Sequence, residues 1–306
     1  MPNSSAPASA DTPSSSFVEA MNGSCLRLAH SDGSVSHLRK WDHARAYRDQ
    51  MPACLLIHGF GESSCSWADY GAALDCFETV YAIDLRGHGD SSWDSAARYD
   101  VEGFADDVVH VLDRLGLAEL AIVGHSLGGD VALQVASMRP ERVRAVVMVD
   151  FGPELSQAGL AKICTDLRAN LRVFDSREAF LDALIEARPL VAKEVAARMA
   201  RDSLRELGEA RFTLKLDCAL ATFEPSDLQS PARCAIVWDK LRALSCPVLV
   251  LRGAMSGMLS RDSAERAAHG TAKGTMREVR GAGHAVMLDN PGGFLAATRE
   301  FFGTLR

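Results

Sequence analysis

From about residue 24 onward, short continuous apolar runs alternate with stretches whose apolar residues recur at helical spacing. Such apolar runs are typical of strands buried on both faces of a parallel sheet. They predict strands at 53–57, 79–83, 120–123, 143–149 and 247–251, after an opening hairpin at 25–29 and 34–39. Helices are predicted at 101–115 and 127–138. The alternation predicts an α/β fold, a doubly wound and mostly parallel sheet with helices on both faces.

The alternation stops after Asp150 and resumes at Pro247. The intervening chain predicts helices over about 154–172, 176–187 and 190–207, with no comparable buried strand. A last helix is predicted over 292–302. The simplest organisation is a parallel-sheet core interrupted by a helical cap. We therefore predict a disordered tail at 1–16, an α/β core at 17–150 and 241–306, and an inserted helical cap at 151–240.

Composition narrows the class of partner. The formal net charge is −7 and no dense basic run occurs, so nucleic acid is not an expected partner. No apolar stretch approaches the roughly 20 residues of a membrane span, and the first 16 residues lack the apolar region of a secretory signal. The eight cysteines form no CxxC pair, which predicts reduced, mostly buried thiols. We expect a cytoplasmic protein that does not bind membranes.

A serine between two glycines is the strongest chemical signal. Gly124-His125-Ser126-Leu127-Gly128 follows an apolar run directly and precedes a predicted helix. This is the G-x-S-x-G elbow in its strand–turn–helix context, where small neighbours allow a tight turn that exposes the serine hydroxyl. A chance glycine-rich turn is the alternative, and the context argues against it. Ser126 is the predicted nucleophile.

A second glycine-rich turn, His58-Gly59-Phe60-Gly61, follows the strand predicted at 53–57. Attack on a carbonyl develops an oxyanion that needs preorganised hydrogen-bond donors. The backbone N–H groups of Phe60 and Leu127 are placed to supply them, because both turns leave neighbouring strands at the same end. The alternative is that residues 58–61 form only a tight strand-to-loop turn.

A serine hydroxyl needs a base, and the chain offers nine histidines. His284 lies in Gly-Ala-Gly-His, after the strand-like run 276–279 and before the last helix, and it is the last histidine. Small neighbours and this position in the order serine, acid, histidine favour it as the base. His58, His88 and His125 lie in turns, where shaping a loop is the simpler role.

Four segments together resemble the α/β-hydrolase superfamily: HGFGESSCSW, DLRGHGDS, GHSLGG and GAGHAVMLDNP. The resemblance runs from about residue 50 to the end and implies a capped serine hydrolase that uses a Ser–His pair and no metal or organic cofactor. It says little about substrate, because the superfamily includes esterases, lactonases, thioesterases, amidases and C–C hydrolases. A serine at the elbow excludes the usual epoxide hydrolase and haloalkane dehalogenase chemistry.

The third catalytic group departs from the superfamily pattern. Relatives carry an aspartate in the loop after the strand 247–251, and Gly257 stands in that slot here. Asp150, at the end of the strand 143–149, is the preferred replacement, since some branches of the superfamily place their acid there. The alternative is that Asp150 caps a helix or pins a loop. Asp262 and Asp239 are weaker candidates.

These residues predict a serine hydrolase, carboxylesterase-like, that cleaves a small-molecule carboxylic ester or a related lactone, thioester or amide through an acyl-enzyme. Two rivals stay open: a cofactor-free lyase or C–C hydrolase on the same scaffold, and a binding protein without activity. A homodimer is possible. An inward-facing cap arginine would suit a substrate carboxylate, but most belong to a solvated surface; the cap arginines are Arg168, Arg172, Arg177, Arg188, Arg198, Arg201 and Arg205.

Overall fold

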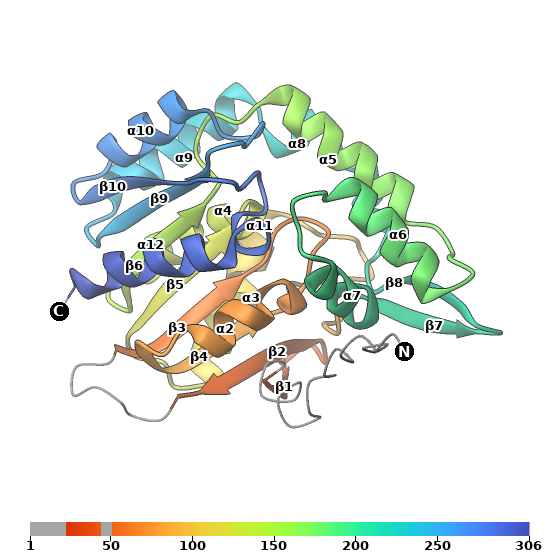
Figure 1. Cartoon of the computed structure of the whole chain (residues 1–306). Coiled ribbons are helices and arrows are strands. Elements are labelled where there is room, and N and C mark those ends of the chain that lie inside the picture. Colours follow the sequence, from red (N-terminus) through yellow and green to blue (C-terminus); the bar gives the residue numbers. More distant parts are fainter. Residues whose placement is uncertain (1–22, 44–50, 306) are drawn as a thin grey trace, which may run out of the picture.

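The computed structural model describes residues 23–43 and 51–305 (Figure 1), so the tail predicted at 1–16 lies outside the described residues. Within them, one sheet holds eight strands in the order β1-β2-β4-β3-β5-β6-β9-β10. β1 and β2 pair antiparallel, as the predicted hairpin requires, and the strands from β4 to β10 are parallel. The strand bounds are Ser24–Ala29 (β1), Val35–Asp42 (β2), Met51–Ile57 (β3), Phe77–Ile83 (β4), Leu120–His125 (β5), Val143–Val149 (β6), Val248–Gly253 (β9) and Gly274–Val279 (β10).

Helices cover both faces of this sheet, which confirms the predicted doubly wound architecture. Each face carries its own buried apolar cluster, because strands buried on both sides send alternate side chains to each. One cluster contains residues of α3 (Val101–Arg114), α4 (Leu127–Met138), α9 (Pro231–Ala243) and α10 (Arg261–His269). The other contains residues of η1 (Ser64–Trp67), α2 (Ala68–Ala73), α11 (Val286–Asp289) and α12 (Pro291–Gly303).

The strand register aligns the carboxyl ends of the central strands. Ile57 at the end of β3 pairs with Gly124, and His125 at the end of β5 pairs with Val149 at the end of β6. Val149 also pairs with Leu251 near the end of β9. The loops that leave these strands therefore meet at one edge of the sheet, where ligands bind in open α/β folds.

The chain between β6 and β9 contains the helices α5, α6 and α7, a small hairpin and three further helices (Figure 1). Their bounds are Gln157–Asn170 (α5), Arg177–Ala187 (α6), Lys193–Asp202 (α7), Leu204–Gly208 (β7), Arg211–Leu214 (β8), Cys218–Thr222 (η2), Pro225–Leu228 (α8) and Pro231–Ala243 (α9). We call residues 150–247 the insertion. The predicted boundary at residue 240 falls within α9, which packs on α4, so the division into core and cap stays a prediction.

The prediction of a helix over 190–207 is wrong at the carboxyl end of this range. α7 ends at Asp202, and the next residues form β7, which pairs antiparallel with β8. The turn of this hairpin places Glu209 and Ala210 at positive φ (51° and 55°). Such a turn is usually signalled by Asn-Gly or Asp-Gly at these two positions. Glu-Ala carries no such signal, so the hairpin could not be seen in the sequence.

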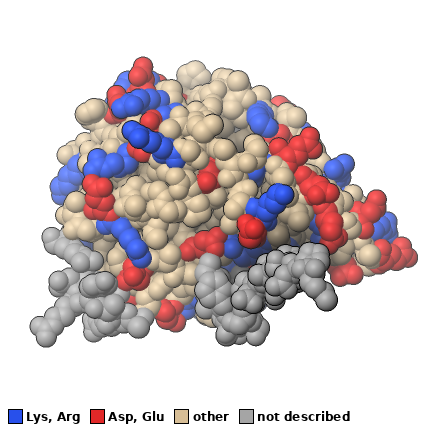
Figure 2. Space-filling model, in the orientation of Figure 1, with Lys and Arg blue, Asp and Glu red and all other residues tan. Residues whose placement is uncertain are grey.

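Among the described residues, every helix is too short or too polar to cross a membrane. Lysine and arginine side chains intermingle with aspartate and glutamate on the face that Figure 2 shows. All eight cysteines are free thiols, but only Cys54, Cys65 and Cys164 are buried, so the prediction that most would be buried is wrong.

Candidate active site

Ser126 lies in a strained turn between β5 and α4, as the predicted elbow requires. Its backbone adopts φ 50° and ψ −117°, which L-residues rarely do. Both flanking glycines are required by close backbone contacts. A Cβ on Gly124 would lie 2.0 Å from the carbonyl oxygen of Gly128, and one on Gly128 would lie 2.2 Å from that of Ile57. The tight turn leaves Ser126 partly exposed at the carboxyl edge of the sheet.

The structure brings His284 and Asp150 together. His284 lies in the loop between β10 and α11, and its Nδ1 lies 2.7 Å from Oδ2 of Asp150. Asp150 directly follows β6, is fully buried and also has a positive φ of 50°. A buried carboxylate needs partners, and an Nδ1–H donated to it leaves Nε2 of His284 as the nitrogen able to accept a proton.

Two further donors hold the Asp150 carboxylate. Its Oδ1 accepts the N–H of Gly253 at 3.3 Å, and its Oδ2 accepts the hydroxyl of Ser256. Ser256 Oγ is itself held by the N–H of Met258 at 3.0 Å. Sequence reasoning missed Ser256, and its position next to Gly257, in the loop that usually carries the acid, was the available signal. Gly257 faces open space, with no atom within 4 Å of an added Cβ.

The weaker acid candidates lie elsewhere. Asp262 is exposed in the first turn of α10, and Asp239 is exposed on α9, paired with Arg242. Neither lines the cavity beside Ser126. Asp150 is therefore the carboxylate that the fold places against His284.

Burial lowers the pKa of His284 below its ordinary value, although the hydrogen bond to Asp150 acts in the opposite direction. The neighbouring His125 adds to the lowering. A base near neutral pH must be unprotonated before it can act. The surroundings of His284 thus favour the form that can accept a proton.

The two predicted oxyanion donors belong to the turns that follow two neighbouring strands, β5 and β3. Leu127 is the first residue of α4, so its N–H is one of those without a partner inside the helix. Phe60 lies in the turn after β3, the strand next to β5, and lines the same cavity as Ser126. His58 and His88 shape this turn: His58 Nε2 accepts the N–H of Leu85 at 3.0 Å, and His88 Nε2 that of Gly61 at 3.2 Å.

A cavity of about 540 Å³ lies beside Ser126 and His284. Its volume suits a small ligand. The insertion contributes many apolar side chains to its wall, among them Ile163, Leu184, Leu190 and Met199. Of the seven cap arginines, Arg188 lines the cavity, and its guanidinium lies 2.9 Å from the carboxylate of Glu62.

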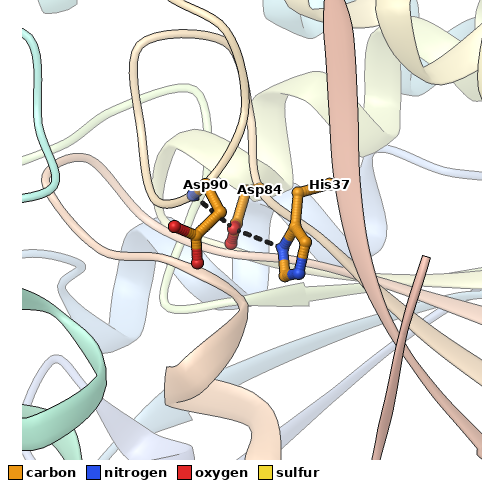
Figure 3. A group of neighbouring side chains, drawn as sticks. All are labelled: His37, Asp84 and Asp90. Carbon is orange, nitrogen blue, oxygen red and sulfur yellow. Dashed lines mark hydrogen bonds and ion pairs between the residues drawn. The ribbon is translucent and has the colours of Figure 1, made fainter. Parts of the chain in front are cut away.

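Side chains of types that can bind a metal ion lie together at one further place, where the ligand atoms of His37, Asp84 and Asp90 are within 4.8 Å of one another (Figure 3). The Asp84 carboxylate already accepts Nδ1 of His37 at 2.7 Å and the N–H groups of Asp90 and Ser64 at 2.9 and 2.6 Å. Asp90 faces the ammonium of Lys215 at 2.9 Å. These contacts pin the loop after β4 to β2 and η1. The absence of a metal or cofactor stays a prediction.

The chain is similar to known proteins over most of its length. The family model described as "alpha/beta hydrolase fold" matches residues 52–291. Esterase Rv0045c of Mycobacterium tuberculosis is 29% identical over 279 residues, covering 89% of this chain and 87% of the esterase.

Two solved structures cover 91% of this chain. One is E-2-(acetamidomethylene)succinate hydrolase, with a TM-score of 0.81, 22% identity and 98% of its own chain covered. The other is an alpha/beta hydrolase from Novosphingobium aromaticivorans, with a TM-score of 0.76, 25% identity and 97% covered. Together with the family model, these findings show that the chain belongs to the α/β-hydrolase family and is a hydrolase on this scaffold.

Proposed function

We propose that this protein is a serine hydrolase that cleaves a carboxylic ester, or a related lactone, thioester or amide, through an acyl-enzyme. The observation that carries the proposal is the 2.7 Å contact between His284 and Asp150 beside the strained Ser126. Asp150 takes the place of the acid that Gly257 cannot supply. A serine, a histidine oriented by a buried acid and a cavity are the parts that nucleophilic acyl transfer needs.

In this mechanism, Ser126 Oγ attacks the carbonyl carbon of the substrate while Nε2 of His284 takes its proton. Asp150 holds the imidazole through Nδ1–H and stabilises its cation. The N–H groups of Phe60 and Leu127 stabilise the oxyanion. His284 then protonates the leaving group, which departs and leaves an acyl group on Ser126. A water deprotonated by His284 attacks this acyl-enzyme, and the acid product leaves as Ser126 recovers its proton.

The similarity to the esterase of M. tuberculosis supports ester cleavage as the first activity to test. The apolar wall of the cavity supports a substrate with an uncharged acyl part. The decisive test is a panel of p-nitrophenyl esters, lactones, thioesters and amides, together with labelling by a fluorophosphonate. A turned-over ester and a label on Ser126 support the proposal.

The same experiment separates the rivals. A lyase or C–C hydrolase would be labelled at Ser126 but would not turn over simple esters. A binding protein would resist the label as well. The contact between His284 and the buried Asp150 favours an enzyme over a binding protein, because a binding role has no use for an oriented base.

We expect kcat/KM to rise with pH along a limb whose apparent pKa lies below 6.5, the ordinary value for histidine. His284 acts only when it is neutral, and burial lowers its pKa. Activity should therefore persist at mildly acidic pH and fall as the pH drops through the lowered pKa. A pH profile of kcat/KM with a stable ester checks this. An apparent pKa above 6.5 for this limb of the kcat/KM profile would contradict the expectation.

We also propose that the insertion determines substrate choice, because it supplies much of the cavity wall. Ile163→Ala should lower kcat/KM for long acyl esters by about 10-fold, with much less change for p-nitrophenyl acetate, because it removes apolar contact with the longer chain. Ile236→Ala is the matched control, since Ile236 is half exposed on α9 and does not line the cavity. An unchanged substrate ranking in Ile163→Ala would contradict this role.

A further inference from the structure

We propose that Glu62 and His125 form a charged pair that positions His284. Neither residue belongs to the Ser126–His284–Asp150 set, although His125 directly precedes Ser126 in the sequence. Both are buried: their side chains are 3% and 2% exposed. The inference rests on the proposed function in taking His284 as the base, but the charge state of the pair can be measured without any substrate.

Beside an ionised Glu62, the contacts of His125 require both of its ring nitrogens to carry a proton. Nδ1 lies 3.1 Å from Oε2 of Glu62, and Nε2 lies 3.0 Å from the backbone carbonyl oxygen of His284. An ionised carboxylate and a carbonyl oxygen can only accept hydrogen bonds, and a neutral imidazole has a single N–H. His125 is therefore an imidazolium when Glu62 is ionised.

Two basic side chains favour the ionised form of Glu62. Burial by itself opposes ionisation, but His125 and Arg188 hold the pKa of Glu62 well below its usual range. Oε1 lies 2.9 Å from the Arg188 guanidinium, and Oε2 also accepts the N–H of Gly59 at 3.3 Å. A buried charge needs partners of this kind. Gly59 makes the approach possible, because a Cβ there would lie 2.7 Å from Nδ1 of His125.

His284 is thus held at two points. Asp150 binds its ring through Nδ1, and His125 binds its backbone carbonyl through Nε2. The second contact fixes the loop between β10 and α11, on which the direction of Nε2 depends. The rings of His125 and His284 also lie 4.7 Å apart, between centroids, at an interplanar angle of 48°. A cation at this distance opposes protonation of His284.

Other charged groups near His284 also affect its pKa. Asp150 and Glu62 favour protonation of His284, whereas His125 opposes it. Asp289 of α11 lines the same cavity and accepts the N–H of Gly283. Its carboxyl group interacts electrostatically with Arg188, His125 and His284. Removing the His125 charge alone should therefore raise the pKa of His284.

The first experiment measures the charge of His125 by ¹⁵N NMR of the imidazole groups, on the full chain without substrate. The His125 signals are assigned as those that disappear in His125→Gln. At about pH 7.5 we expect two protonated ring nitrogens with the chemical shifts of an imidazolium. Glu62→Gln should return His125 to the neutral form. A neutral His125 in the unmodified protein would overturn the proposal, whatever the enzyme's substrate is.

The second experiment compares two variants in the pH profile of kcat/KM. His125→Gln places an amide N–H close to the position of Nε2 and removes the charge. The acidic limb should move up by about one pH unit, since a charge 4.7 Å away affects a neighbouring pKa on that scale. His125→Asn loses the contact with the carbonyl of His284 and should lower kcat further, by about 10-fold.

A control variant separates the positioning of His284 by His125 from the contact that Glu62 makes with the insertion. Arg188→Gln removes the contact between the insertion and Glu62 but keeps the His125–His284 contact, so it should change KM without moving the acidic limb upward. An unmoved limb in a folded His125→Gln variant would overturn the proposal. If Ser126→Ala stayed active, the proposed mechanism would fail instead, and the NMR result would still report on the charged pair.

Discussion

Ser126→Ala is expected to lower kcat at least about 10⁴-fold in the ester hydrolysis proposed above. Removing the nucleophile of a serine hydrolase abolishes the acyl-enzyme route and leaves only the assistance of binding and the oxyanion donors. The fold should survive. Alanine keeps the Cβ of serine, so the strain of the φ 50° turn is the same in both, and the variant should show a similar Tm by circular dichroism.

Ser137→Ala is the matched control for this variant. Ser137 lies on α4, where its hydroxyl donates to the carbonyl of Leu133, and it does not line the cavity. Its replacement should leave the ester activity intact. A folded Ser126→Ala protein that kept more than about a tenth of the wild-type kcat would remove Ser126 as the nucleophile. Loss of fluorophosphonate labelling in Ser126→Ala alone would support the assignment by a second route.

The sequence predicted the sheet well because each buried strand is a local signal. Runs such as 53–57 and 143–149 need no knowledge of distant residues to be read as strands, and both form. The hairpin β7–β8 was missed for the opposite reason. Its turn residues, Glu209 and Ala210, do not favour positive φ, so tertiary contacts must stabilise it. The backbone pairing of Phe212 with Phe174 is such a contact, and both side chains are buried.

The site was predictable only as far as motifs define it. Ser126 and His284 lie within recognisable motifs. Asp150 could be proposed because Gly257 occupies the position at which relatives carry the catalytic aspartate. Glu62 carries no comparable signal, and Ser256 is marked only by its position next to Gly257. Their importance lies in contacts between residues far apart in the sequence, Ser256 with Asp150 and Glu62 with His125. Such contacts follow from the close packing of loops at one sheet edge, which no local pattern records.

Asp150→Asn is expected to lower kcat by up to about 10⁴-fold, the scale of the same change in a serine protease. The amide nitrogen would meet Nδ1 of His284 as a donor, so the imidazole would carry its proton on Nε2 and could not accept one from Ser126. Asparagine tolerates positive φ better than most residues, so the backbone at φ 50° should remain unstrained. Steady-state kinetics and a Tm measurement check both statements.

A loss of activity alone would not prove the role, because Asp150 also binds Gly253 and Ser256. Ser256→Ala addresses this point. It removes one hydrogen bond to the carboxylate while keeping the contact with His284, so its effect on kcat should be far smaller than that of Asp150→Asn. Equal losses in the two variants would indicate that Asp150 acts by holding the loop that contains Ser256.

A second carboxylate provides the sharper test. Gly257→Asp should restore at least about 10-fold of the kcat lost in Asp150→Asn, because residue 257 lines the same cavity as His284 and an added Cβ there meets no atom within 4 Å. Gly257→Asn in the same background has the same size without the charge and should restore nothing. Gly257→Asp in the unmodified enzyme should change kcat little, so the two sites should be strongly non-additive. Near-normal kcat in folded Asp150→Asn would refute the assignment, whereas rescue by aspartate but not by asparagine would show that His284 needs a carboxylate partner.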